Sequence, residues 1–177
     1  MASPIKRNNK LTAPNGYAGN IFGVSNCASF GKEKITTQTS TGALTTQPGT
    51  RLLDVAVVAG GGSGSQAGAG GGGGGMIVSS NVKVCGNSPY AQVVGGGGTS
   101  TSYPDVCTRG GNGEDSAFAP GTAIAVCTTG GGAGGNNASG SADPSGSGAP
   151  GGSGGGMGAN TQGAAGPSVG SGTAGQG

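Results

Sequence analysis

The sequence predicts a mainly β and irregular fold, in which short β-strands are followed by a bundle of polyproline II-type (polyglycine II) helices, with no α-helix of note. Glycine provides 46 of the 177 residues, in blocks at 60–64, 70–75, 95–98, 130–135 and 151–158. Val-rich segments separate these blocks, and no segment shows the 3.6-residue apolar period of a helix. Chains with evenly spread glycine tend to be disordered. The alternation of blocks and apolar segments instead indicates bare backbones that pack side by side.

Short β-branched segments between turn signals predict the strands. Residues 52–58 have the length and the Val content of a buried strand. Residues 76–94 are expected to add further strands, with 81–94 forming a hairpin around a Gly-Asn-Ser-Pro turn. The last clear strand is expected at 123–127, and the threonines of 36–46 suit a pleated strand pair.

Residues 130–177 consist almost entirely of Gly, Ala, Ser, Asn and Pro, so they cannot bury ordinary apolar side chains. Glycines recur here at a spacing of three, as in Gly148, Gly151 and Gly154. Polyproline II has three residues per turn and no internal hydrogen bonds, so its N–H and C=O groups must pair with neighbouring chains. Glycine lacks the Cβ atom that would hold such chains apart. A strict Gly-X-Y repeat is not kept, which excludes collagen.

The first 34 residues differ in composition from the rest of the chain. They hold five of the eight basic residues and three of the six aromatic residues. We therefore expect 1–34 to be an attachment segment and 35–177 to be the glycine-rich domain. The basic residues could contact phosphate, but a solvated terminus is the favoured interpretation. The candidates for attachment are Lys6, Arg7, Lys10, Tyr17, Phe22 and Phe30.

Charge and hydropathy exclude several classes of partner. Charged residues make up 8% of the chain and the formal net charge is +2, which argues against a nucleic-acid partner. No apolar run approaches the roughly 20 residues that span a bilayer, so no membrane insertion is expected. The basic N-terminus lacks the apolar stretch of a signal peptide, which predicts synthesis and assembly in a cytoplasm.

Catalytic and cofactor chemistry has little support in the sequence, so we expect no enzyme, no cofactor and no metal. Histidine is absent, which removes the Ser-His-Asp and Cys-His arrangements. The spacing of Gly62, Gly64 and Ala67 matches a dinucleotide-binding loop, but more glycine follows it where a helix is required. The oxygens of 112–115 could form a calcium site, but solvated carboxylates in a Gly-rich loop are the favoured interpretation. Zinc is disfavoured because no C-x-x-C pair occurs.

The chain has four cysteines, Cys27, Cys85, Cys107 and Cys127. They are too few and too widely spaced for a disulfide scaffold. Cys85 and Cys127 each end a Val-rich segment, where a thiol behaves as a small apolar group. Free buried thiols are the favoured state, and bridges from Cys107 to Cys85 or to Cys127 remain the alternative.

An ordered series of motifs runs along the chain after residue 35. The series begins with Thr39-Ser-Thr-Gly-Ala-Leu-Thr-Thr-Gln-Pro and Asp54-Val-Ala-Val-Val-Ala-Gly-Gly-Gly. It continues with Tyr90-Ala-Gln-Val-Val-Gly-Gly-Gly-Gly and Gly110-Gly-Asn-Gly-Glu-Asp-Ser-Ala-Phe. Ile124-Ala-Val-Cys-Thr-Thr-Gly-Gly-Gly-Ala-Gly-Gly completes it. In this order the motifs resemble the glycine-rich domains of bacteriophage tail-fibre and marine-virus proteins, and 110–118 resembles a turn of that family. The resemblance covers about residues 35–177.

This resemblance implies a sandwich of polyglycine II helices with variable loops at one end, as in phage adhesins that bind receptors on the host surface. We therefore expect a non-enzymatic virion protein, a tail-fibre or adhesin component assembled in the host cytoplasm. Its partners would be a host receptor and, through 1–34, other virion proteins. Fibres are commonly homotrimers. The expected contact loops are 99–109 and 112–118. Their receptor-contact candidates are Tyr103, Asp105, Arg109, Glu114, Asp115 and Phe118.

Other interpretations of the same residues stay open. Tyr103 and Phe118 could instead cap the ends of the bundle. The alternative function is a capsid-decorating or head-fibre structural protein that 1–34 anchors to the shell. An ice-binding protein is disfavoured because its flat Gly-x-x face needs more regular glycine blocks.

Overall fold

The computed structural model describes residues 34–65, 68–101, 108–137, 146–159 and 168–176. The chain divides into two units, Met1–Thr37 and Gln38–Gly177, and the second unit contains every strand. All six candidate attachment residues, Lys6, Arg7, Lys10, Tyr17, Phe22 and Phe30, lie outside the described residues. The fold of the described residues is mainly β, with two small antiparallel sheets and no α-helix. No helix that could span a membrane occurs among them.

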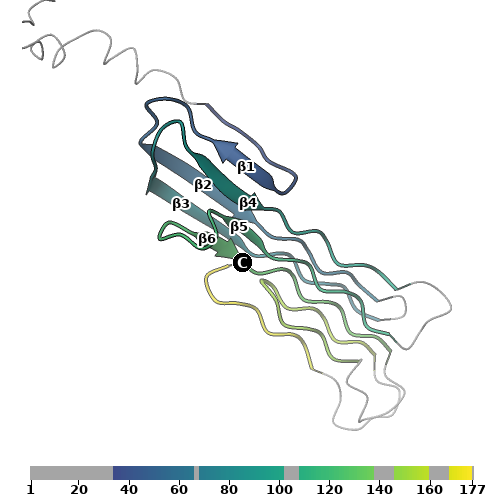
Figure 1. Ribbon diagram of the computed structural model, residues 1–177. Coiled ribbons are helices and arrows are strands. Elements are labelled where there is room, and N and C mark those ends of the chain that lie inside the picture. Colours follow the sequence, from purple (N-terminus) through teal and green to yellow (C-terminus); the bar gives the residue numbers. More distant parts are fainter. Residues whose placement is uncertain (1–33, 66–67, 102–107, 138–145, 160–167, 177) are drawn as a thin grey trace, which may run out of the picture. The chain divides into compact units, whose positions relative to one another are not determined.

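The two sheets contain six strands (Figure 1). One sheet has four strands in the order β1-β4-β5-β6, and the other consists of β2 and β3. The strands are β1 (Gly42–Thr45), β2 (Leu52–Val58), β3 (Met76–Lys83), β4 (Pro89–Val93), β5 (Ser116–Phe118) and β6 (Val126–Thr128). β2 packs on β5 and β6, and β3 packs on β6. The sheets therefore face each other as a small sandwich.

Alternating side chains fill the space between the sheets. Inward residues of β2 and β3, such as Val57 and Val82, meet Phe118 and Val126 of the other sheet. Tyr90 stacks on Phe118, with ring centroids 5.8 Å apart and an interplanar angle of 28°. The Tyr90 hydroxyl oxygen also accepts a hydrogen bond from the Cys85 N–H at 2.8 Å. Tyr90 and Phe118, the two aromatic residues of this domain within the described ranges, thus share one core.

A bulge interrupts the pairing of β2 with β3. Leu53 pairs with Val82 and Val55 pairs with Ser79, so two residues of β3 face Asp54 alone. Asn81 has a φ of 59°, in the left-handed region that Asn tolerates. Its N–H donates to Asp54 Oδ1 at 2.8 Å, which compensates for the lost ladder bond. The bulge returns Val82 to the inward face after the extra residue.

The strand predicted at 52–58 is confirmed, but the hairpin predicted for 81–94 is wrong. β3 pairs with β2, whereas β4 pairs with β1 and β5 in the opposite sheet. The turn between them crosses the sandwich: the Asn87 N–H donates to Thr46 O at 3.1 Å. Crossing allows Val82 and Tyr90 to approach the core from opposite sheets, which a flat hairpin would not permit.

Two other boundaries differ from the sequence expectation. Residues 112–118 are not a loop, because 116–118 form β5 in the middle of the four-stranded sheet. The expected strand 123–127 begins late, as β6 at Val126, because a turn occupies the preceding residues. In that turn the Thr122 hydroxyl donates to Ala119 O at 2.8 Å, and Gly121 has a φ of 78°.

The thiols of Cys85 and Cys127 are free, as expected, but they are exposed and not buried. In β6 the flanking residues Val126 and Thr128 face inward, and strand alternation therefore places Cys127 outward. Cys27 and Cys107 lie outside the described residues.

Beyond the sheets, the chain continues as extended segments that run side by side (Figure 1). We number eight of them in chain order. They are segment 1 (59–65), segment 2 (69–75), segment 3 (95–101), segment 4 (109–115), segment 5 (129–136), segment 6 (146–149), segment 7 (151–158) and segment 8 (168–173). Segments 1, 3 and 5 follow β2, β4 and β6 directly, and segments 2 and 4 lead into β3 and β5. The segment after β2 is therefore not the helix that a dinucleotide-binding loop would need.

Segment 5 shows that these segments do not form a sheet. A strand in a sheet bonds to at most two neighbours, whereas segment 5 exchanges backbone hydrogen bonds with five. The Gly131 N–H donates to Gly60 O of segment 1, and the Gly132 N–H donates to Ser153 O of segment 7. Segments 2, 4 and 6 donate to it through Gly72, Gly113 and Ala149. These bonds measure 2.7–3.0 Å.

The backbone hydrogen bonds between the described segments arrange them in three stacked rows. Segments 3, 1 and 2 form the first row, segments 4, 5 and 7 the second, and segments 6 and 8 the third. Successive bonds between a given pair are three residues apart: Gly60 and Ser63 of segment 1 donate to Glu114 and Gly111 of segment 4. The bonds of a segment thus repeat every three residues and are directed to neighbours on several sides.

Candidate functional site

Four internal stretches of 38–177 lie outside the described residues, and the residues on both sides of each stretch lie at the same end of the segments (Figure 1). We call this end the loop end. It is defined by the described residues that flank those stretches: Ser65, Gly68, Thr101, Thr108, Asn137, Gly146, Ala159 and Ser168. The segment before each stretch runs away from the sheets, and the segment after it runs back toward them (Figure 1). This topology places all four pairs of flanks opposite the strands.

Hydrogen bonds tie these flanks together across the segments. The Ser65 hydroxyl donates to Gly135 O at 2.7 Å, and the Ser65 N–H donates to Ala69 O at 3.2 Å. The Gly158 N–H donates to Gly146 O at 2.8 Å. The side-chain oxygen of Asn137 is buried and has no hydrogen-bond partner. The loop end is thus a fixed frame of small polar residues.

The predicted contact residues of 99–109 fall partly within this frame. Tyr103 and Asp105 lie outside the described residues. Arg109 is exposed, and its guanidinium donates to Ser147 O at 3.4 Å. Its side chain therefore reaches from segment 4 to segment 6.

The predicted contact residues of 112–118 have internal partners. Asp115 Oδ1 accepts the Gly130 N–H at 2.8 Å, and Glu114 Oε2 accepts the Gly96 N–H at 3.1 Å. Phe118 is 4% exposed and lies in the sandwich core, so its ring is not a surface contact. The prediction that Phe118 faces a receptor is corrected for this reason: in β5 it alternates inward, opposite Tyr90.

Sequence reasoning missed the arrangement of Arg109, Asn112 and Asp115, which we call the polar ladder. Asn112 Oδ1 accepts the Ala133 N–H at 2.9 Å, one repeat before Asp115 accepts the Gly130 N–H. Arg109 stands one repeat further back. The spacing of three, the same as in the glycine blocks, is the signal that would have found the ladder.

The polar ladder takes the place of a ninth segment. In close-packed rows an interior segment has six neighbours, and segment 5 has five. On the sixth side, between segments 4 and 6, the N–H groups of Gly130 and Ala133 meet side-chain oxygens in place of another backbone. The side-chain oxygens of Asn112 and Asp115, which a calcium site at 112–115 would use, therefore accept N–H groups of segment 5. Among the described residues, no group of three or more acidic, His or Cys side chains could hold a metal ion.

We expect Asn112→Ala to lower the free energy of unfolding by about 1–3 kcal/mol, because the N–H of fully buried Ala133 would lose its partner. Glu114→Ala is the matched control: Gly96 is exposed, so water can replace the carboxylate, and we expect a change within about 0.5 kcal/mol. Urea unfolding of both variants measures the difference. Equal effects would contradict the assignment of the ladder.

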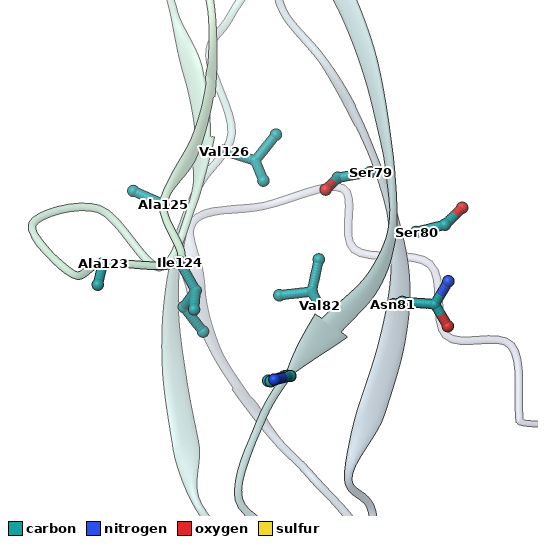
Figure 2. Close-up of a pocket in the computed structure, with 9 residues that line it drawn as sticks. Ser79, Ser80, Asn81, Val82, Ala123, Ile124, Ala125 and Val126 are labelled. Carbon is teal, nitrogen blue, oxygen red and sulfur yellow. The ribbon is translucent and has the colours of Figure 1, made fainter.

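A hollow lies at the side of the sandwich between β3 and the residues that lead into β6. It has a volume of about 410 Å³ and is lined by residues 79–83 and 123–126. Figure 2 shows Val82, Ile124 and Val126 converging on it, while Ser80 and Asn81 point away. Lys83 is the one ionisable group among its lining residues, so the hollow offers apolar contact but no acid–base pair.

Comparison with known families matches residues 36–177 to the glycine-rich domain. Neither the comparison with curated proteins nor that with solved structures gave a match. The match includes all six strands and all eight segments. On this ground the chain belongs to the glycine-rich domain family.

Proposed function

We propose that this chain is a structural component of a bacteriophage virion, a tail-fibre or adhesin part that displays loops for recognition of the host surface. The observation that carries the proposal is that all eight residues that define the loop end lie together at one end of the segments. Hydrogen bonds such as the one from Ser65 Oγ to Gly135 O connect the segments there. A frame that holds the ends of several loops lowers the entropy that those loops lose on binding. The glycine-rich domain family and the motif series in 35–177 support the same assignment.

The proposal includes the fold of the frame, which we take to be a polyglycine II bundle. Three features support this assignment: bonds repeat every three residues, one segment bonds to five others, and the buried positions of the segments, with the exception of Asn136, are mostly glycine and alanine. Ala133 is 0% exposed and Ala149 is 1% exposed, so peptide groups fill the space that side chains fill elsewhere. Such a frame is rigid because every shift of one segment breaks bonds on several sides.

In this proposal the recognition residues are Tyr103, Asp105 and Arg109 in 99–109, because Tyr and Arg are frequent anchors at binding surfaces. Glu114 and Asp115 contribute indirectly, since their carboxylates hold segment 4 in place. Residues 1–34, with Lys6, Arg7, Lys10, Tyr17, Phe22 and Phe30, would attach the domain to other virion proteins. The site of action is then the virion, and the partner is a host receptor.

The test is competition with infection. Purified full-length protein is expected to bind intact host cells and to block adsorption of the phage that encodes it. Tyr103→Ala should weaken the block at least tenfold, whereas Arg51→Ala, an exposed substitution beside β2, should leave it unchanged. Absence of binding, with the labelled chain found in many copies over the capsid, would replace the proposal by the capsid-decorating function.

A further inference from the structure

The outer face of the two-stranded sheet exposes a group of apolar side chains, next to the outward polar residues Asp54, Ser80 and Lys83. Leu52 and Val58 of β2 are 52% and 56% exposed, and Met76 and Val78 of β3 are 52% and 60% exposed. These side chains alternate with the inward residues that pack on the opposite sheet. We call Leu52, Ala56, Val58, Met76 and Val78 the β2–β3 face.

The register makes this face continuous. Val58 pairs with Met76, and Ala56 pairs with Val78. Paired residues of an antiparallel ladder have Cβ atoms about 4.5–5.5 Å apart, so four side chains of the face form one block. Leu52 lies further along β2, separated from the block by the outward Asp54, and pairs with Lys83.

Such a face indicates an interface. Soluble monomers rarely leave large contiguous apolar patches in water, and patches that remain commonly mark binding sites. A sheet of only two strands is also marginal until both of its faces are packed. Only the inner face of β2 and β3 packs on the other sheet.

We infer that a second copy of this chain covers the β2–β3 face, in a dimer with a twofold axis along the strands. Such an axis places β2 of one copy over β3 of the other at the same level of the ladder. Val58 then meets the partner's Met76, and the small Ala56 meets the partner's larger Val78. Sheets that pack face to face align within about 30°, which keeps these levels in contact.

The charges at one end of the face fit the same symmetry. Asp54 of β2 and Lys83 of β3 carry opposite charges. Lys83 pairs with Leu52, and Asp54 is the next outward residue of β2 after Leu52. The bond from the Asn81 N–H holds the Asp54 carboxylate at the bulge. Because a twofold contact sets residue i against j and j against i, Asp54 comes within reach of the partner's Lys83, and Lys83 within reach of the partner's Asp54. The face is thus complementary to itself.

Light scattering coupled to size exclusion, on the full chain over a concentration series, tests the dimer. The expected mass at high concentration is twice the 16.1 kDa of one chain. Val78→Lys and Met76→Lys should each shift the mass to that of one chain, because each places a cation against an apolar partner. Val169→Lys is the matched control: Val169 is 66% exposed on segment 8, and this variant should keep the dimer.

A charge variant tests the orientation of the dimer. Lys83→Glu places a carboxylate near the partner's Asp54 in both halves of the contact. This repulsion should weaken dimerisation up to about fivefold, and salt should reduce the effect. Circular dichroism before and after melting checks that each variant folds. A wild-type mass of one or three chains would overturn the inference, and so would a dimer that survives both Val78→Lys and Met76→Lys.

Discussion

Gly132→Ala is expected to lower the free energy of unfolding by more than about 3 kcal/mol, although it adds a single methyl group. That methyl would overlap Ala149 O of segment 6 and stand 2.8 Å from Gly155 N of segment 7. Overpacking an ordinary core costs about 1–3 kcal/mol because side chains can shift. Here the obstacles are backbone atoms held by hydrogen bonds on several sides. Urea or thermal unfolding measures the loss.

Two adjacent glycines of segment 2 provide a control with the same local sequence. A Cβ atom at Gly72 would overlap Ser153 O, whereas the nearest atom to a Cβ at Gly73 is Ser153 Oγ at 3.9 Å. Gly72→Ala should therefore destabilise the domain as Gly132→Ala does. Gly73→Ala should leave stability unchanged or raise it by up to about 1 kcal/mol, because alanine restricts the unfolded chain. Equal melting temperatures for the two variants would remove the case for packed bare backbones.

Phe118→Ala is expected to cost about 3–5 kcal/mol, the range for removal of a large buried ring. Phe118 is 4% exposed, and its ring stacks on Tyr90 between the two sheets. In a domain of this size the loss corresponds to a decrease of roughly 10 °C in melting temperature. Differential scanning calorimetry of the full chain measures it.

Conservative variants at the same contact separate a core role from a surface role. Phe118→Leu keeps much of the buried volume and should melt well above Phe118→Ala. Tyr90→Phe keeps the stacked ring and loses only the acceptor of the Cys85 N–H, so we expect a cost of about 0.5–1.5 kcal/mol. If Phe118→Ala melted like the wild type, Phe118 would not be a core residue.

The exposure of three candidate residues could be anticipated from the sequence, but their internal contacts could not. The sequence placed Arg109, Glu114 and Asp115 in a polar stretch between glycine blocks, and the structure describes them as exposed. Which N–H each oxygen accepts depends on segments up to 21 residues away, as in the bond from Ala133 to Asn112. Local propensity carries no information about such partners. The inward position of Phe118 was missed because a strand of three residues is too short to show a period of two.

The sequence by itself determined the mainly β class, the strand at 52–58 and the glycine blocks at which backbone segments can pack closely. It did so because β-branching and the absence of Cβ atoms act within a few residues. Only the tertiary structure decided that β3 and β4 lie in opposite sheets, that segment 5 bonds to five neighbours, and that the side chains of Asn112 and Asp115 replace a sixth. These choices depend on which distant backbone supplies each hydrogen bond. A run of glycines has no side chains to indicate that partner.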